Sequence, residues 1–495
     1  MSSRYQVGLR RRTKIVCTIG PASNTAATIE RLVRAGMDCA RLNFSHGTPD
    51  EHFEVIEKVR KASQVTGRRV AVMQDLPGPK LRVGKLRGGS MQIARGSTVF
   101  LTTKPASGGI STIPIRSKNL PRYVKVDGTI FLSDGSIKLK ILDTTETDIR
   151  CRCEIGGTLL SGKGVNIPDL KHGLKSFTER DRRYLALGLE HGVDLVAVSF
   201  VRTASDIEEV REFIRKKRSE PMIVAKIEKK EAVDNMDRII EATDAVMVAR
   251  GDMGVENPIE EVPELQKSII SKCRSKGVPV ITATQMLESM VDNASPTRAE
   301  VTDVANAILD GTDAVMLSEE TAVGKYPVEC VEVLNRVALK AEEMMLDGEK
   351  TGRLGSPRRE SPADALSEAA YQISQDIGAS VIAVQSETGA VLPRISRFRP
   401  RAPIFFASES EAKLRRSKMI WGVYQVEPGE TRGFESSVEL VQRLAKDKFV
   451  RRGDSVVVIR ETAEPAKEPG FSLSVSIVGE GKKQDSGEVS PRSSV

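Results

Sequence analysis

Short apolar segments that alternate with helical segments limit the fold of this chain more than any other feature. Eight runs rich in β-branched and other apolar residues recur along the sequence, as expected of buried strands. They are Lys14–Ile19, Cys39–Phe44, Val70–Gln74, Leu195–Val201, Ile223–Ile227, Ala245–Val248, Val280–Thr284 and Ala314–Leu317. Segments with apolar residues at helical spacing lie between most of them. This alternation predicts an α/β fold, a TIM (β/α)8 barrel, with its site at the carboxyl ends of the strands.

A long interruption separates the third strand from the helix expected to begin at Thr178. Its short alternating segments are Thr98–Thr102, Thr129–Leu132, Ser136–Ile141 and Ile149–Glu154. Asp-Gly pairs at 127–128 and 134–135 are typical of tight turns between such strands. We therefore expect an inserted all-β domain, a small β-barrel, that can act as a lid over the barrel mouth.

The last part of the chain alternates between helix and strand patterns once more. The predicted elements are Ala363–Asp376, Val381–Val384, Pro403–Phe406, Val438–Phe449, Ser455–Ile459 and Leu473–Val478. They indicate a smaller, doubly wound C-terminal α/β domain. The predicted organisation is an N-terminal segment (1–12), a barrel in two parts (13–80 and 170–350), the insert (81–169), a linker (351–362), the C-terminal domain (363–480) and a disordered tail (481–495).

Composition narrows the class of protein. Hydrophobic residues make up 39% and charged residues 29% of the 495 residues, which is typical of a globular protein. The sequence has neither an apolar run of the roughly 18 residues that a membrane helix needs nor a signal-peptide core, so we expect a cytoplasmic protein that does not bind membranes. The net charge of +8 is a small difference between 75 basic and 67 acidic residues, and with 4% aromatic residues it does not favour nucleic-acid binding.

The scarcity of two residue types limits the metal chemistry. Four His residues are too few for a His-rich site, and six scattered Cys residues show no zinc-like spacing and are expected to be reduced thiols. A metal site would therefore have to use carboxylates, which points to magnesium.

Two neighbouring strands of the predicted barrel end in charged residues. Strand alternation places Lys226 and Glu228 on one face, and Asp252 follows Gly251 at the end of the next strand. The carboxylates of Glu228 and Asp252 would form a two-ligand site of the kind that magnesium occupies. Either motif alone could equally be explained by an ordinary ion pair at the barrel rim, but their combination on neighbouring strands favours function.

Other strand ends contribute further polar groups. Alternation aligns Arg41, Asn43 and Ser45, which suits an anion held by Arg41 with two neutral ligands beside it. The segment 157–164 resembles a phosphate-binding P-loop, but Gly164 replaces the required Ser or Thr, so only Lys163 is expected to reach a phosphate.

Several of these segments together resemble the pyruvate kinase family, from about Arg12 to Val478. The matching segments are Lys14-Ile-Val-Cys-Thr-Ile-Gly-Pro-Ala-Ser, Ala40-Arg-Leu-Asn-Phe-Ser-His-Gly, Ser161-Gly-Lys-Gly-Val-Asn, Ala225-Lys-Ile-Glu, Ala249-Arg-Gly-Asp-Met-Gly-Val-Glu, Thr282-Ala-Thr-Gln-Met-Leu-Glu-Ser-Met and Met316-Leu-Ser-Glu-Glu-Thr-Ala. The resemblance implies a kinase of the last step of glycolysis, which transfers phosphate from phosphoenolpyruvate to ADP to give pyruvate and ATP. It also implies a homotetramer.

The resemblance assigns roles to individual residues. Glu228 and Asp252 would hold Mg²⁺, with Mn²⁺ as an alternative. Arg41 would hold the transferred phosphoryl group, and Lys226 would stabilise its charge. The implied catalytic residues are Lys226, Arg41, Thr284, Ser318 and Glu320, with Thr284 beside the enolate carbon and the last two in the relay that protonates it. The implied substrate-binding residues are Arg41, Lys226, Gly251, Asp252 and Thr284, and the implied nucleotide-binding residues are Asn43, His46, Arg82 and Lys163.

One departure from the family concerns the monovalent cation. Members that require potassium carry Glu where this chain has Lys80, although the implied potassium ligands Asn43, Ser45, Asp75 and the carbonyl of Leu76 are present. We expect the ammonium of Lys80 to replace the ion, so that K⁺ is not required. The alternative is a solvent-facing lysine at the hinge of the insert.

A second departure concerns the effector loop. The family's sugar-phosphate loop is rich in Ser and Thr, whereas Ser386–Val391 includes an acidic residue and ends in Ala390 and Val391. Activation by fructose 1,6-bisphosphate is therefore not expected, and another phosphorylated effector such as AMP stays open.

Two rival functions are less well supported. A barrel lyase or carboxylase that acts on pyruvate or phosphoenolpyruvate would not need the insert with Lys163. A catalytically silent regulatory or nucleic-acid-binding relative would be expected to lack Lys226, Glu228 or Asp252, and all three are present.

Overall fold

The computed structural model describes residues 11–104, 111–115, 117, 120–133, 135–168, 175–347, 361–426, 436–462 and 470–479. Eight parallel strands close into a barrel in the order β1-β17-β16-β15-β14-β13-β3-β2. These strands are β1 (Lys14–Thr18), β2 (Cys39–Asn43), β3 (Ala71–Leu76), β13 (Leu195–Val198), β14 (Met222–Ile227), β15 (Ala245–Ala249), β16 (Val280–Ala283) and β17 (Ala314–Leu317). The predicted (β/α)8 barrel is confirmed.

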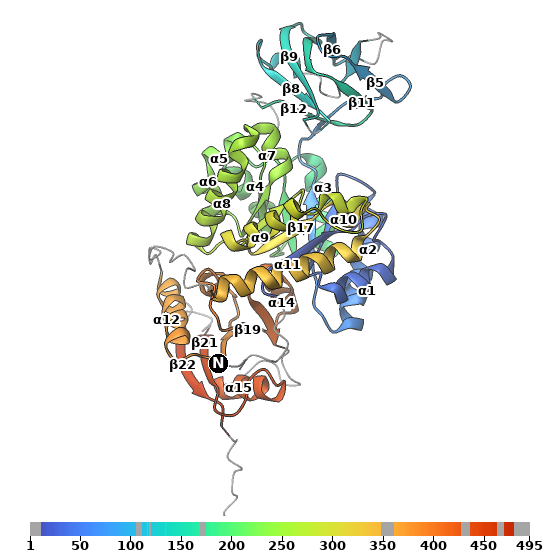
Figure 1. Cartoon of the computed structure of the whole chain (residues 1–495). Coiled ribbons are helices and arrows are strands. Elements are labelled where there is room, and N and C mark those ends of the chain that lie inside the picture. Colours follow the sequence, from blue (N-terminus) through green and yellow to red (C-terminus); the bar gives the residue numbers. More distant parts are fainter. Residues whose placement is uncertain are drawn as a thin grey trace, which may run out of the picture. The chain divides into compact units, whose positions relative to one another are not determined.

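Helices surround the barrel strands (Figure 1). They are α1 (Ala26–Ala35), α2 (Pro49–Thr66), α3 (Glu179–Glu190), α4 (Ala204–Lys216), α5 (Lys230–Asp234), α6 (Met236–Ala242), α7 (Arg250–Glu256), α8 (Val262–Lys276), α9 (Arg298–Asp310), α10 (Glu319–Ala322) and α11 (Pro327–Asp347). Helices α2, α3 and α9 begin with a capping box, in which a Thr side chain and an acidic side chain satisfy each other's backbone N–H groups. Such local signals explain why these helices could be predicted from sequence.

The barrel interior is a packed core. Small and medium side chains from the strands fill it, including Val16, Ala71, Met73, Met247 and Met316, all at most 2% exposed. A second, larger cluster lies between the strands and the surrounding helices. Because the interior is filled, the charged residues at the strand ends are held at the rim.

The insert between β3 and α3 has a hydrophobic core of its own. Its strands form a seven-stranded sheet, β4-β12-β8-β9-β10-β6-β7, and a two-stranded sheet, β11-β5. They are β4 (Leu81–Arg82), β5 (Ser90–Ile93), β6 (Thr98–Thr102), β7 (Thr112–Pro114), β8 (Thr129–Leu132), β9 (Ile137–Thr144), β10 (Asp148–Ile155), β11 (Gly157–Leu160) and β12 (Gly164–Asn166). The P-loop-like segment 157–164 thus consists of β11, a turn and the first residue of β12, and the residues directly after it continue this strand instead of opening a helix.

The C-terminal unit is an α/β domain with a five-stranded sheet in the order β20-β19-β18-β21-β22. Strand β18 pairs in parallel with β19 and β21, whereas β22 pairs antiparallel to β21. Its elements are α12 (Pro362–Asp376), β18 (Val381–Gln385), α13 (Val391–Ser396), β19 (Ile404–Ala407), β20 (Val423–Val426), α15 (Ser437–Lys446), β21 (Ser455–Thr462) and β22 (Gly470–Ile477). Residues 411–423, with α14 (Glu411–Arg416), group with the barrel.

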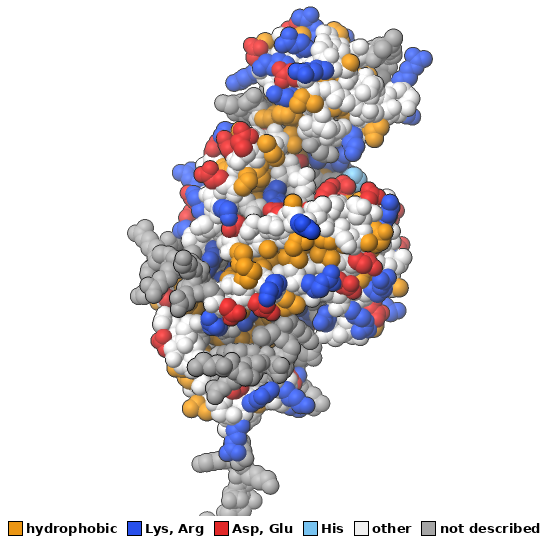
Figure 2. Space-filling view, in the orientation of Figure 1, with side chains coloured by type: hydrophobic (Ala, Val, Ile, Leu, Met, Phe, Trp, Pro, Cys, Tyr) orange, Lys and Arg blue, Asp and Glu red, His pale blue; other side chains and the backbone are white. Residues whose placement is uncertain are grey.

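Three sequence predictions lie largely or wholly outside the described residues: the N-terminal segment, the linker at 351–362 and the tail at 481–495. None of the helices in the described part of the chain combines the length and apolar character that crossing a membrane requires. On the face drawn in Figure 2, basic and acidic side chains are intermixed.

Candidate active site

A lysine and two carboxylates lie at the centre of the barrel rim. The ammonium of Lys226, in β14, lies 2.8 Å from Oε1 of Glu228 and 3.4 Å from Oδ1 of Asp75. It also donates a hydrogen bond of 2.7 Å to Oγ of Ser199, which follows β13. Burial by itself would lower the pKa of Lys226, but the two carboxylates outweigh burial and raise the pKa above its ordinary value. Lys226 therefore stays cationic.

Arg41 completes this cluster from β2. Its Nε donates to Oδ2 of Asp75 at 2.7 Å, and its Nη1 donates to Oγ1 of Thr18 at 2.8 Å. Burial would raise the pKa of Asp75, but Lys226 and Arg41 hold it below its ordinary value. Asp75 is therefore an ionised carboxylate that orients two cations.

The carboxylate of Glu228 is in a less favourable setting. Its side chain is 1% exposed, and burial together with the charge of Asp252 raises its pKa, although Lys226 opposes the rise. The backbone N–H of Phe200 donates to its Oε2 at 2.8 Å. A cation bound between Glu228 and Asp252 would therefore stabilise the ionised form of the Glu228 carboxylate.

Asp252 lies in α7, which begins directly after β15. Its side chain is 28% exposed, and the ammonium of Lys80 lies 3.8 Å from its Oδ1. Gly251, next to it, donates its N–H to Oγ1 of Thr284 at 2.9 Å. The segment that carries Gly251 and Asp252 is thus a short helix that faces the end of β16.

Thr284 has a left-handed backbone, with φ of +68°, which is rare for a β-branched residue. The guanidinium of Arg250 stabilises this conformation by donating to the carbonyl of Thr284 at 2.6 Å and pairing with Asp303 at 2.5 Å. A strained backbone that neighbours over-determine is typical of a functional site.

Ser318 and Glu320 lie at the end of β17. The N–H groups of Ser318 and Leu287 donate to the carboxylate of Glu320, at 2.6 and 3.1 Å. Burial raises the pKa of Glu320, and these N–H groups oppose the rise. Glu320 is held in place by backbone groups.

The implied nucleotide residues come from both the barrel and the insert. In the insert, Arg82 pairs in register with Gly164 and donates to the carbonyl of Gly162, so it lies next to the turn that carries Lys163. In the barrel, Asn43 accepts the N–H of Ser45 at 3.1 Å. Burial and the cations of Arg82, Lys80 and Arg41 lower the pKa of His46, which favours its neutral form.

The implied potassium ligands are already partly engaged. Asp75 binds Arg41 and Lys226, and Leu76 is the last residue of β3. Lys80, from the chain that leads into the insert, is close to Asp252.

Among the described residues that contact this cluster, sequence reasoning missed Thr18, Ser199 and Phe200. Ser199 is the first polar residue after β13, a signal that could have been used. Phe200 has a left-handed backbone with φ of +58°, which directs its N–H at Glu228. No pattern in the sequence predicts this conformation for an aromatic residue.

Fold and site together define a class: a (β/α)8-barrel protein with an inserted β domain, a C-terminal α/β domain and a buried cluster of cations and carboxylates at the barrel rim. Family models agree with this class. The pyruvate kinase barrel domain matches residues 10–331, and the pyruvate kinase alpha/beta domain matches residues 364–470.

Known proteins are similar over most of the chain. A pyruvate kinase of Thermococcus litoralis is 43% identical over 454 residues, which cover 90% of this chain and 94% of the relative. A pyruvate kinase of Geobacillus stearothermophilus is 40% identical over 91% of this chain and 77% of its own length. Pyruvate kinase 2 of Synechocystis is 40% identical over 98% of this chain and 83% of its own length. The chain belongs to the pyruvate kinase family and is an enzyme of that kind.

Proposed function

We propose that the enzyme transfers the phosphoryl group of phosphoenolpyruvate to ADP and releases pyruvate and ATP, as in the last step of glycolysis. The observation that carries this proposal is the cluster in which Lys226 lies 2.8 Å from Glu228 while Asp75 orients both Lys226 and Arg41. Phosphoryl transfer needs little covalent help from a protein and depends on positioned charges. This cluster supplies them.

The residues present fit a magnesium ion. Glu228 and Asp252 offer hard carboxylate oxygens, and their proximity contributes to the raised pKa of Glu228, so a divalent cation would relieve their repulsion. In the described part of the chain no group of three or more His, Cys, Asp or Glu residues could hold a metal ion. Magnesium in proteins usually keeps several waters and is bound through one or two carboxylates. When bound, Mg²⁺ or Mn²⁺ would neutralise charge on phosphate oxygens.

Each of the other site residues has its own role in the reaction. Arg41 binds the phosphoryl group, whose bond to the enol oxygen breaks as a bond to an ADP oxygen forms. Lys226 stabilises the charge on the phosphoryl group and on the enolate left behind. Thr284 lies beside the enolate carbon, and Ser318 and Glu320 take part in the relay that delivers its proton. Gly251 and Asp252 line the substrate site.

ADP binding uses Asn43 and His46 of the barrel together with Arg82 and Lys163 of the insert. The proximity of Arg82 to the turn that carries Lys163 supports this assignment, because two cationic residues close to each other suit a diphosphate.

We propose that Lys80 makes the enzyme independent of potassium. Its ammonium lies 3.8 Å from Asp252, so a tethered positive charge is present at the site without a free ion. The test is pyruvate formation from phosphoenolpyruvate and ADP with Mg²⁺, in tetramethylammonium buffer with and without K⁺. We expect the wild type to be active in both buffers and Lys80→Glu to require K⁺.

Lys85→Glu, at an exposed residue of the insert, makes the same charge change and serves as the control. If the wild type needs K⁺, the proposed role of Lys80 is wrong, but the proposed reaction stands. A wild type inactive in both buffers would contradict the proposed reaction.

On the basis of family membership we also propose that the enzyme is cytoplasmic and that it forms a homotetramer. Cell fractionation tests the first. Light scattering tests the second, with an expected mass four times that of one chain.

A further inference from the structure

A second buried ion pair connects the two segments that carry the proposed metal ligands. Lys229 directly follows Glu228, and Glu256 lies at the end of α7, four residues after Asp252. The ammonium of Lys229 lies 2.5 Å from Oε1 of Glu256. The side chain of Glu256 is 1% exposed and that of Lys229 is 18% exposed, so the pair is largely shielded from water.

This pair lines a pocket where the chain enters and leaves the insert. Residues 79–81, which lead into the insert, and residues 165–168, which lead out of it, form one side of the pocket. Phe200, Lys229 and Glu256 lie on the barrel side. The ion pair is therefore next to both connections of the insert as well as to the barrel rim.

The surroundings of Glu256 are not those of a simple surface salt bridge. Burial raises its pKa, and Lys229 and the buried side chain of Asn166, in β12, oppose the rise. Its Oε2 has no hydrogen-bond partner among the described residues. Lys229 also lies 5.7 Å from the ring of Phe200, whose N–H binds Glu228.

We propose that Lys229 and Glu256 are positioning residues that fix the distance between the carboxylates of Glu228 and Asp252. This inference rests on the proposed metal site. The carboxylates of Glu228 and Asp252 repel each other when no cation lies between them. The ion pair of Lys229 and Glu256 ties together the two segments that carry these carboxylates, and would keep their separation at the distance that the ion needs. Groups that orient metal ligands change metal affinity by about 10- to 100-fold when they are removed.

A merely structural role predicts a different result. Buried ion pairs add little net stability, and their replacement by apolar residues of similar volume is often neutral or stabilising. If Lys229 and Glu256 only filled space, the double variant Lys229→Met/Glu256→Met would bind metal as the wild type does.

The experiment measures Mn²⁺ binding to the full chain without substrates, by titration with electron paramagnetic resonance. We expect Glu256→Gln and the double Met variant to bind Mn²⁺ about 10-fold or more weakly, with kcat recovering at high Mn²⁺. Thermal melting verifies that each variant is folded. If Glu256→Gln does not fold, the Mn²⁺ affinity of the double variant decides the test.

The matched control is Glu231→Gln in the same pocket. Glu231 is 45% exposed and lies 3.6 Å from Arg202. Its substitution by Gln removes one negative charge, as Glu256→Gln does, but leaves the buried pair of Lys229 and Glu256 intact. We expect its Mn²⁺ affinity to stay within about twofold of the wild type.

Glu228→Gln separates this inference from the proposed metal site. If Glu228→Gln loses Mn²⁺ affinity while folded Glu256→Gln and the double variant keep it, the positioning role is wrong and the metal site stands. If Glu228→Gln binds Mn²⁺ as tightly as the wild type, the metal site is wrong and the positioning role with it.

Discussion

Lys226 illustrates how several partners define the chemistry of one residue. Asp75, Glu228 and Ser199 all contact its ammonium, which therefore stays charged although it is buried. We expect Lys226→Met to lower kcat by about 100-fold or more, because a positioned charge that stabilises developing negative charge is worth that much. Steady-state kinetics with saturating Mg²⁺ measures it.

Lys230→Met is the control for this prediction, because Lys230 is 67% exposed and lies four residues further along the chain. If Lys226→Met kept its kcat while folded, the central role of this cation would be wrong.

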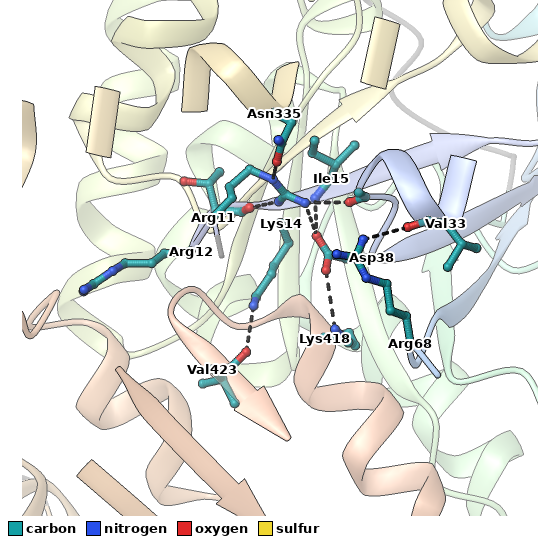
Figure 3. Close-up of polar contacts among 12 residues, drawn as sticks. Arg11, Arg12, Lys14, Ile15, Val33, Asp38, Arg68, Asn335, Lys418 and Val423 are labelled. Atoms are coloured by element: carbon teal, nitrogen blue, oxygen red, sulfur yellow. Dashed lines mark hydrogen bonds and ion pairs between the residues drawn. The ribbon is translucent and has the colours of Figure 1, made fainter. Parts of the chain in front are cut away.

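A second buried lysine, Lys14, lies at the start of β1, away from the active site. Its ammonium donates to the carbonyl of Val423 at 2.7 Å (Figure 3). Asp38, Lys418, Arg11 and Glu342 are the charged groups that act on it, and burial lowers its pKa to about 7. Asp38 is itself held between Arg11, at 2.8 Å, and Lys418, at 3.6 Å.

The low pKa of Lys14 predicts a dependence of stability on pH. Between pH 7 and the ordinary pKa of 10.5 the unfolded chain binds the extra proton, so the free energy of unfolding rises with pH in this window. The contribution is at most about 1.4 kcal/mol per pH unit. Lys14→Met should remove this slope, whereas below pH 7 its difference from the wild type should be constant.

Denaturant titrations of both proteins at about pH 6.5, 8 and 9.5 provide the comparison. Parallel stability curves for the two proteins across this window would contradict the lowered pKa of Lys14.

Among the elements, the loop after β18 holds a carboxylate where the family resemblance implies an effector phosphate. Thr388 donates its N–H and its hydroxyl to the carboxylate of Glu461, in β21, at 3.2 and 2.8 Å. Ser386 donates its hydroxyl to the same carboxylate and accepts the N–H of Gly389. The hydroxyl groups of Ser386 and Thr388, which could bind a phosphate, are therefore engaged by the chain itself.

We expect fructose 1,6-bisphosphate not to activate the enzyme, as measured by its effect on the phosphoenolpyruvate saturation curve. Glu461→Gln removes the negative charge from the loop, so inorganic phosphate should raise the melting temperature of this variant more than that of the wild type. Adding Thr388→Val should remove the gain. Equal protection of the wild type and Glu461→Gln would show that Glu461 does not block an anion site.

Most elements of the barrel could be predicted from sequence because their signals are local. Capped helices and apolar strands carry their pattern within a few residues of each other. The sequence did not predict twelve short elements, whose conformation depends on distant partners: helices α5, α6, α7, α10, α13 and α14 and strands β4, β5, β7, β11, β12 and β20. In α7, Gly251 and Gly254 indicate a loop, but the N–H of Gly251 binds Thr284 and helix α8 packs against α7.

At the scale of the whole barrel, residues 411–423 contribute to its core from far along the chain. Met419 belongs to the same interior cluster as Met247, Ile281 and Met316. Trp421 is fully buried, and the guanidinium of Arg12 lies 5.3 Å from its ring. Arg415, in α14, pairs with Asp194 at 2.8 Å. The barrel core is thus completed by a segment that follows β18 and β19 in sequence.

Met419→Ala should lower the free energy of unfolding by about 2–5 kcal/mol, as expected when a buried Met is truncated in a packed core. Met344→Ala, at a residue that is 57% exposed, should change it by less than about 0.5 kcal/mol. Denaturant unfolding of both variants measures the difference. Equal effects would mean that residues 411–423 are not part of the barrel core in solution.

The sequence by itself determined the barrel, the position of the insert and the charged residues at the strand ends, because periodicity and strand alternation act over a few residues. Only the tertiary structure decided which groups surround them. The contacts of Lys226 with Ser199, of Lys229 with Glu256, of Lys14 with Val423 and of Thr388 with Glu461 join segments that lie apart in sequence. Such contacts depend on how the whole chain packs, and no local pattern encodes them.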